Sequence, residues 1–596
     1  MQSGSTLTTP ELGSTQHAML VVWGHFARSI GLLEQLQTVP IPQKTVIHQP
    51  TAKLTEFFIS LLAGNEYLTD LSEAAAPLVR DREVAAAWQL RSLAEASSVS
   101  RTLKACDDRS LAALEAALDT VSRPFFQRAV NDLRERNDLF VLDADLTGLP
   151  VSSSSRTYPG AAFGYMDGEI RLGYQLAQVC LQTSLFGRQW LTARHHPGNT
   201  VSCECLRGLI AEAERQLGCH PRRRPDLVEQ RLAVAEQALA ELEGRVARQE
   251  EAIAVQRGRV DCLRERLGQV QARAEALSAT PLSSRQTGPY STLTRLQKQI
   301  VSVQGQLRRA EARLARLRIA ALGLRARARR QWEEGERLRA RRERLLAENG
   351  RQPDAPRCKM RLDAGFCSGE NLTELIELGY EVETKSANDA LVRALRQRVT
   401  TETSWTRVGD NAEMVAWTNY QIRHCPYPLT VGLERFHTPK ELRHAVLIRS
   451  QDRPQAPCPD LQEWFHAYNG RQTIEAGNKE EKGTFRVQHL MSRSPSGIRI
   501  QGLLTAFAAN FVRWADEWVR PRVEQSSPRF VEVLSSPKRL VRVAANSPAF
   551  VDRSHGELQV QFSDLSSFPA VIICLSRIHP VQLHLPLFAN DHFSGP

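Results

Sequence analysis

The chain has 596 residues, which is long enough for about four domains. Its formal net charge of +11 favours a polyanionic partner, although this charge is modest for so long a chain. No stretch approaches 18 consecutive apolar residues, and the first residues lack the basic and apolar regions of a signal peptide. We therefore expect a soluble, unsecreted protein without a membrane partner. Eleven cysteines without a Cys-x-x-Cys pair argue against a disulfide framework or structural zinc.

Residues 1–130 have the pattern of a helical domain. The amphipathic runs cover residues 54–62, 71–88 and 111–121. Residues 92–103 resemble the end of a helix-turn-helix, in which a helix carrying Arg101 and Lys104 contacts phosphate groups. This region is thus a candidate DNA-binding domain, and a plain helical bundle is the alternative.

Residues 131–225 change to strand patterns followed by a helix. Strands are predicted over 139–146, 170–182 and 186–193, and a helix over 201–217. The first strand ends with Asp143 and Asp145, whose spacing of two places both side chains on one side of the strand. An adjacent histidine pair, His195 and His196, is expected in the loop before the helix, where it is more often exposed than metal-binding.

Residues 226–350 carry apolar or small residues at steps of 3, 4 or 7 in two phases. A Pro, Gly and Ser-rich breaker at 280–289 separates the two phases. This pattern predicts an antiparallel coiled-coil hairpin inserted into the surrounding domain. Its second arm is rich in Arg, and dimerisation, DNA contact and an inert spacer remain equal alternatives for its role.

The remaining chain divides into four further segments. Residues 351–390 contain a strand that ends in Asp363, and residues 391–458 read as a β-rich insertion. Residues 459–525 contain a polar helix and then a long amphipathic helix over 500–519. The tail, 526–596, is interrupted by Pro and includes a possible last strand at 570–575.

The polar helix of this third segment holds the most informative spacing in the chain. Its phenol, cations and carboxylate are Tyr468, Arg471, Glu475 and Lys482. At 100° per residue these side chains lie within roughly 60° of one another on a continuous helix. Glu oxygens ligate Mg²⁺ and Arg binds phosphate, so the stripe suits a nuclease, whereas a solvated charged face is the alternative.

The spacing Tyr-x2-Arg-x3-Glu-x6-Lys resembles the signature of insertion-sequence DDE transposases. Residues 360–366, with Asp363 before Ala-Gly-Phe, resemble the strand that carries the family's second Asp. Asp145-Leu146-Thr147 resembles its Asp-x-Thr, with Asp143 as the alternative first acid. The resemblance covers roughly 50–520 apart from the inserted hairpin, and it implies an α/β fold with an RNase H-like core.

The resemblance further implies metal-dependent cleavage of DNA and strand transfer at the ends of a mobile element. Asp145, Asp363 and Glu475 would hold Mg²⁺, which Mn²⁺ can replace, while Tyr468, Arg471 and Lys482 would contact DNA phosphate. The implied partners are inverted-repeat ends and target duplex DNA, bound by a homodimer in a bacterial-type, nucleoid-associated cytoplasmic location. Two alternatives remain: a nuclease that cuts without joining, and an inactive DNA-binding or coiled-coil scaffold derived from a transposase.

Overall fold

The computed structural model forms two compact units, residues 1–222 with 354–596 and residues 223–353. It describes residues 12–45, 47–152, 158–166, 168–279, 291–386, 388–437, 441–451, 457–523, 536–554, 557–563 and 571–575. The mixed α/β class that the sequence predicts is confirmed.

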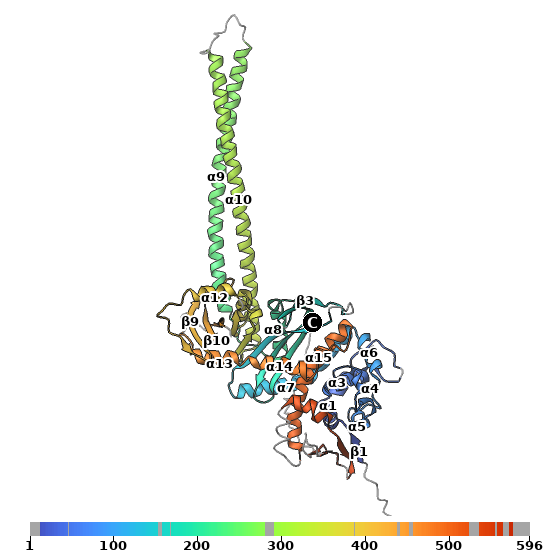
Figure 1. The fold of residues 1–596 in the computed structure, drawn as a ribbon. Helices are drawn as coiled ribbons and strands as arrows, with labels where there is room; N and C mark the ends of the chain where they lie inside the picture. The colour runs from blue at the N-terminus through green and yellow to red at the C-terminus, as the bar shows by residue number, and fades with distance from the viewer. Residues whose placement is uncertain are drawn as a thin grey trace, which may run out of the picture. The chain divides into compact units, whose positions relative to one another are not determined.

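A mixed ten-stranded sheet forms the centre of the first unit (Figure 1). Its first five strands in chain order are β2 (Phe140–Pro150), β3 (Ala162–Met166), β4 (Glu169–Thr183), β5 (Gly187–Pro197) and β6 (Cys358–Leu362). The other five are β7 (Glu381–Ser386), β8 (Thr406–Arg407), β9 (Ala412–Tyr420), β10 (Leu429–His437) and β11 (Leu442–Ser450). β4 pairs antiparallel with β2 and β5, whereas β6 and β7 continue the sheet in parallel with β2.

Strand alternation gives the middle of this sheet two different faces. Apolar residues on one face are almost completely buried, namely Leu142, Ala144, Met360, Leu362 and Val382. The alternate residues on the opposite face are charged, namely Asp143, Asp145, Lys359, Arg361 and Glu383. Helices α8 (Ser202–Leu217) and α11 (Gly369–Glu377) pack against β4 and β7. The sheet therefore buries a charged face as well as an apolar one.

The β-rich segment after α12 (Asp389–Arg396) extends the central sheet. β11 pairs antiparallel with β7, and β10, β9 and β8 follow in order towards the edge. A small apolar cluster that includes Trp464 and Tyr468 packs against this extension. Consequently, the segment between Asp363 and Glu475 is continuous with the strands that carry the acids.

The N-terminal region is helical from residue 18 onward, as predicted. Its helices are α1 (Ala18–Ser29), α2 (Leu32–Gln37), α3 (Pro50–Leu62), α4 (Asp70–Glu73), α5 (Arg82–Ala87), α6 (Ala96–Ala105) and α7 (Asp108–Glu135). The single amphipathic run expected over 71–88 is wrong: Pro77 and the 3₁₀ turn Leu78–Arg80 separate α4 from α5.

The long helix α15 (Pro495–Val519) joins the N-terminal helices to the sheet (Figure 1). Its aromatic side chains pack against several of these helices, with Phe125 stacked on Trp514 at a centroid distance of 4.3 Å. Asn510 exchanges two 2.8 Å hydrogen bonds with the backbone of Trp190 on β5. The amphipathic helix predicted over 500–519 is thus confirmed as a core element.

The structure contains strands in two regions that the sequence pattern predicts as a helix and a loop. β1 (Leu12–Thr15) lies in the region predicted as helical, and it pairs with β12 (Ala549–Asp552) across more than 500 residues. A four-stranded sheet results, completed by β13 (Gln559–Phe562) and β14 (Ile572–Cys574), of which the last lies within the strand predicted at 570–575. His195 and His196 belong to β5 rather than to a loop, because β5 extends to Pro197.

The second unit is a hairpin of two long helices, α9 (Pro225–Ser278) and α10 (Thr292–Arg351), which run side by side (Figure 1). Arg223 pairs with Glu348 near the ends of the hairpin, and Arg264 pairs with Glu311 further along, so the helices are antiparallel. Apolar residues from both helices bury a common seam, including Val260, Leu263, Val303 and Leu314. The predicted breaker at 280–289 lies outside the described residues.

None of the described helices combines the length and apolar character that a membrane span requires.

Candidate active site

The first two predicted acids are adjacent because β2 and β6 are parallel neighbours. Ala144 pairs with Leu362 in the register, so Asp145 and Asp363 follow at the same level of the sheet. β6 ends at Leu362, and a 3₁₀ turn, Ala364–Phe366, buries Phe366 directly after the acid. The two acids thus come from strands that are more than 200 residues apart in the chain.

Glu475 reaches the same place from a helix that is interrupted. The expected continuous stripe is instead divided between α13 (Leu461–Asn469) and α14 (Gln472–Gly483). At the junction the amide of Arg471 bonds to the carbonyl of Tyr468, an i→i−3 bond in place of the α-helical i→i−4 bond. This turn changes the direction of Tyr468 relative to Glu475.

Asp145, Asp363 and Glu475 all interact with the Arg471 guanidinium. Nη2 of Arg471 lies 2.8 Å from Oδ1 of Asp145, and Nη1 lies 3.6 Å from Oδ1 of Asp363 and 3.3 Å from Oε1 of Glu475. Arg471 is 6% exposed and Asp145 13% exposed, whereas Asp363 and Glu475 are about half exposed. The four residues therefore form a partly open cluster, which we call the carboxylate cluster.

Burial and like charge act together on Asp145. Burial raises the pKa of this carboxyl above its ordinary value, Arg471 opposes the shift, and the Asp363 and Glu475 carboxylates add to it. For Arg471, burial lowers the pKa, but the surrounding carboxylates outweigh burial and raise it overall. Arg471 is thus held as a cation, and Asp145 depends on that cation to remain ionised in a buried position.

Asp143 belongs to a different interaction. It is fully buried, and Arg361 donates to it from Nε at 2.6 Å and from Nη2 at 2.8 Å. Gln182 adds a third bond at 3.0 Å. Both carboxylate oxygens of Asp143 therefore bond to groups of neighbouring strands, whereas those of Asp145 bond to Arg471 and Asn478 at the carboxylate cluster. Of the two candidate first acids, the geometry brings only Asp145 together with Asp363 and Glu475.

Hydrogen bonds from the polar sheet face fix α14 in position. Asn478 donates to Oδ2 of Asp145 at 2.5 Å, and Gln178 donates to the buried Glu481 at 2.9 Å. Gln182 also donates to Thr473 at 2.9 Å. Sequence reasoning missed these residues, although Asn478 lies three positions after Glu475, within the same stripe of the helix, and Gln178 pairs with Asp145 in the register.

Two glycines allow α13 and α14 to approach the sheet closely. A Cβ at Gly470 would lie 2.5 Å from Nη1 of Arg361, which donates to the Ala467 carbonyl at 2.8 Å. A Cβ at Gly477 would lie 2.4 Å from Cζ of Arg188. Arg188 bonds to the Thr473 carbonyl and lies 3.7 Å from Glu480, so its guanidinium is tied to α14. A side chain at either point would therefore displace an Arg guanidinium that is bonded to these helices.

The remaining predicted site residues lie outside the carboxylate cluster. Tyr468 is buried, and its hydroxyl donates to the Leu362 carbonyl at 3.2 Å, directly before Asp363. Burial raises the Tyr468 pKa well above its ordinary value. Lys482 is half-buried two helical turns after Glu475, on the same side of α14. Tyr468 is thus placed to position Asp363 rather than to face solvent.

Arg101 and Lys104 lie on α6, where both are exposed. Arg101 donates to Ser98 at 3.1 Å within its own helix. α6 packs on α3, α4 and α15, and its buried residues include Val99 and Leu103. The two cations are accessible, and the surrounding packing is that of a helical bundle.

The donor set of the carboxylate cluster has the right chemistry for Mg²⁺ or Mn²⁺, which prefer carboxylate oxygens. Within the described parts of the chain, however, no three His, Cys, Asp or Glu side chains are arranged to hold a metal ion. The positive charge that the three acids share is the Arg471 guanidinium. The acids fit a metal by type, and in this structure they surround the Arg471 guanidinium.

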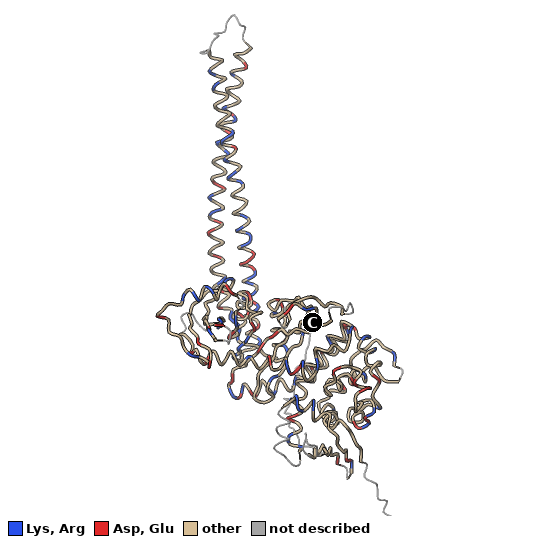
Figure 2. The backbone as a smooth tube through the Cα atoms, viewed as in Figure 1, with Lys and Arg blue, Asp and Glu red and all other residues tan. Residues whose placement is uncertain are grey.

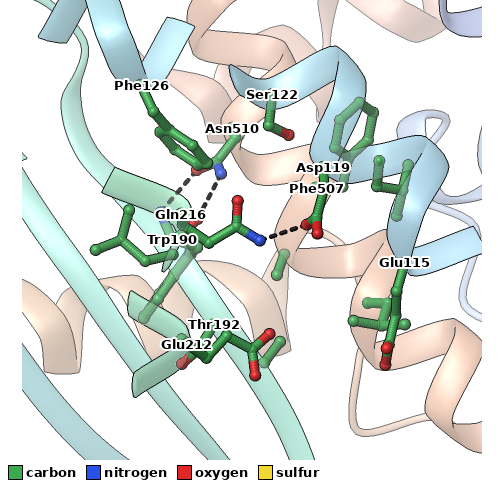
Figure 3. A pocket seen from close by; sticks show the side chains of 15 residues that line it. Glu115, Asp119, Ser122, Phe126, Trp190, Thr192, Glu212, Gln216, Phe507 and Asn510 are labelled. Carbon is green, nitrogen blue, oxygen red and sulfur yellow. Dashed lines mark hydrogen bonds between the residues drawn. The ribbon is translucent and has the colours of Figure 1, made fainter. Parts of the chain in front are cut away.

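A separate pocket lies between α7, β5, α8 and α15 (Figure 3). Two of its polar contacts join lining residues to one another: Gln216 with Asp119, and Asn510 with the backbone of Trp190. No member of the carboxylate cluster lines it. Three acids also line the pocket, namely Glu115, Asp119 and Glu212. They form ion pairs with Arg194 and Arg215 on the neighbouring strand and helix.

Comparison with protein-family models gives no match for this chain, and comparison with curated proteins gives none either.

Proposed function

We propose that this protein is a DDE-class transposase that cuts DNA at the ends of a mobile element and joins the cut ends to a target. The observation that carries the proposal is the convergence of Asp145, Asp363 and Glu475 on Arg471, at 2.8, 3.6 and 3.3 Å. Three segments far apart in the chain supply these acids. They are the acids that the transposase signature selects.

The sheet topology supports an RNase H-like core. Apart from the short β3, which pairs with β4, three antiparallel strands are followed by a helix and then by two strands parallel to the first, in the spatial order β5-β4-β2-β6-β7. This is the order expected of an RNase H-like sheet. The acids lie at the carboxyl end of β6 and beside it on β2, where open α/β sheets place their ligands.

The reaction is a substitution at phosphorus. A water oxygen forms a bond to phosphorus as the bond to the 3′ oxygen breaks, and the freed 3′ hydroxyl later attacks a target phosphate in the same way. Asp145, Asp363 and Glu475 would hold Mg²⁺ or Mn²⁺, which would supply activation of the attacking oxygen and stabilisation of the leaving oxygen. Arg471 and Lys482 neutralise phosphate charge beside the acids.

Other parts of the chain support the reaction indirectly. Tyr468 positions Asp363 through the Leu362 carbonyl, and Asn478 orients Asp145. The N-terminal helices, with Arg101 and Lys104 exposed, bind the ends of the element. α9 and α10 form a coiled coil, and the protein acts as a homodimer on paired ends in a nucleoid-associated, bacterial-type cytoplasmic setting.

One observation favours a second candidate function. Arg471 takes the position between the acids, and the described residues hold no group arranged for a metal. A chain that keeps this arrangement when DNA is bound would be a non-catalytic DNA-binding scaffold derived from a transposase.

Cleavage of the DNA that flanks the gene distinguishes these candidates. The flanking sequence is placed on a plasmid and incubated with the full chain in Mg²⁺, in Mn²⁺ and in EDTA. Nicks and joined products at inverted repeats, in the two metals alone, support a transposase. Nicks without joined products support a nuclease, and binding without cleavage supports the scaffold.

A further inference from the structure

The excess positive charge of the protein is concentrated in the α9–α10 hairpin. Residues 223–353 contain 28 Lys and Arg and 16 Asp and Glu, a net charge of +12, whereas the whole chain has +11. The remainder of the chain therefore carries −1. Blue segments recur along both helices of the hairpin in Figure 2. A polyanion would be attracted mainly to this unit.

The charge is also uneven along the hairpin. Residues 291–320, the first half of α10, contain seven Lys and Arg and one acid, Glu311. By contrast, residues 223–251, which comprise the start of α9 and the two residues before it, contain five Arg and seven acids. Several Arg of late α10 pair with these acids, for example Arg339 with Glu236 and Arg325 with Glu250. The half of the hairpin near residues 279 and 291 thus keeps a large unpaired positive charge.

Helical spacing gathers these cations into stripes. On α9, Arg259, Arg266 and Arg273 recur at intervals of seven residues. On α10, Arg295, Arg309 and Arg316 also fall at multiples of seven, with Lys298 and Arg313 three or four residues from them. Residues at these spacings share one side of a helix. We call these eight residues the basic flank.

Both stripes face the same side of the hairpin. Measured from the buried seam at 100° per residue, each stripe precedes the seam by roughly 60–140°, and equal rotational offsets project to one side in an antiparallel pair. Asp261, Glu275 and Glu311 follow the seam and so face the opposite side, whereas Glu265 lies on the side of α9 directly away from the seam and accepts a hydrogen bond from Gln269. The Arg264–Glu311 ion pair, 2.7 Å long, crosses the seam on that opposite side. The basic flank therefore contains cations without intervening acids.

All eight side chains of the basic flank are exposed. Within the described part of the chain, none of them makes an ion pair or a side-chain hydrogen bond. Along α10 they extend over roughly 30 Å, at 1.5 Å per residue. This is a straight, regularly spaced row of cations that has no partner of its own.

We propose that the basic flank is a docking surface for the backbone of duplex DNA, used without regard to sequence. A duplex presents about one phosphate charge per 1.7 Å of its axis, so it matches a straight row of this length. Two packed helices are wider than the major groove, so the row contacts phosphates and does not read bases. The inference goes beyond the proposed cleavage function, because it requires none of the acids.

Equilibrium binding by the full chain tests this docking surface. The probe is a random-sequence duplex of about 30 base pairs, followed by fluorescence anisotropy in EDTA over a range of salt concentrations. The flank variant changes Arg259, Arg266, Arg273, Arg309 and Arg313 to Gln. The matched control changes five ion-paired Arg of the same hairpin to Gln, namely Arg264, Arg325, Arg329, Arg339 and Arg342.

Both variants lose the same net charge, but only the flank variant loses the unpaired row. We expect the flank variant to bind at least about tenfold more weakly and its salt dependence, log Kd against log salt, to be shallower by about 4. The control should change much less in both quantities. Equal losses in both variants, or unchanged binding by the flank variant, would overturn the proposal.

Three further measurements separate a loss of DNA docking from misfolding, from altered assembly and from a loss of RNA binding. A flank variant that loses helical circular dichroism is replaced by the three-site variant Arg266, Arg309 and Arg313 to Gln, with a slope change of about 3. Size measurement without DNA that shows altered assembly would assign the flank to a second copy and overturn the proposal. Binding of single-stranded RNA by the parent and the flank variant is measured as well. If the flank variant keeps its duplex binding and loses RNA binding, the proposal is overturned. If variants of Asp145, Asp363 or Glu475 still bind DNA but fail to cut it, the result concerns the proposed cleavage function and not the basic flank.

Discussion

Arg471 donates from Nη2 to Oδ1 of Asp145 at 2.8 Å, and both side chains are almost withdrawn from water. The same guanidinium reaches Asp363 and Glu475, which are half exposed. One cation thus offsets the mutual repulsion of three carboxylates in a setting where water screens them poorly.

Replacing Arg471 with Ala should lower the free energy of unfolding by about 3 kcal/mol, because it leaves Asp145 buried without its cation. Mg²⁺ should stabilise this variant more than the parent, since the freed acids then face one another. Urea unfolding with and without millimolar Mg²⁺ measures both effects. An unchanged midpoint, or an equal response to Mg²⁺ in the two proteins, would show that the cluster does not depend on Arg471.

Asp143→Asn should mainly reduce stability, whereas Asp145→Asn should mainly reduce cleavage. Asp143→Asn leaves the buried Arg361 with a neutral partner and should cost about 3–5 kcal/mol of stability. Asp145→Asn should cost less, because Arg471 retains two carboxylates, and should abolish cleavage. Unfolding and nicking assays on both variants separate the two roles, and loss of cleavage in Asp143→Asn alone would exchange them.

Glu481 makes the stability of the folded protein depend on pH, and replacing this one residue should remove its contribution. Burial raises the pKa of this carboxyl to about 7 in the folded protein, against 4.5 ordinarily. Its contribution to stability is complete below the ordinary pKa and is lost as pH rises through about 7. Glu481→Gln should match the parent near pH 4 and exceed it above pH 7. A stability difference that stays constant from pH 4 to pH 8 would contradict this assignment.

Gly477→Ala should disturb the seating of α14 on the sheet. The new Cβ would lie 2.4 Å from Cζ of the tied Arg188, so we expect a loss of about 1–3 kcal/mol. Gly483→Ala in the same helix is the control, because its nearest neighbour is 3.6 Å away and Ala favours helix. Thermal unfolding of both variants is sufficient. Equal midpoints would show that α14 can shift at little cost.

Local sequence pattern predicted much of this fold. The alternation in residues 139–146 gave the strand and the shared side of Asp143 and Asp145, and the heptad pattern gave two long helices. The two-residue alternation of side chains along a strand also indicates Arg361, which precedes Asp363 by two residues on the same strand face. The helix spacing of Tyr468, Arg471, Glu475 and Lys482 indicated Arg471 and Glu475, and the structure places both of them beside Asp145 and Asp363.

The failures come from interactions that local pattern does not contain. β1 exists because it pairs with β12, a contact across the whole chain, and no periodicity in four residues indicates that. The helix junction at Arg471 follows from tertiary demands: Tyr468 bonds to Leu362 while Arg471 reaches Asp145. His195 was expected in a loop because Pro-Gly follows it, but pairing with Leu176 extends β5 past it.

Strand cleavage by single-acid variants tests the central claim most directly. Asp363→Asn and Glu475→Gln are compared with the parent and with Glu463→Gln, an exposed acid of α13 outside the carboxylate cluster. On the gene's flanking DNA in Mg²⁺ and Mn²⁺, we expect both cluster variants to bind the DNA without cutting it. Glu463→Gln should cut like the parent. Cleavage by Glu475→Gln at the parental rate would contradict the central claim.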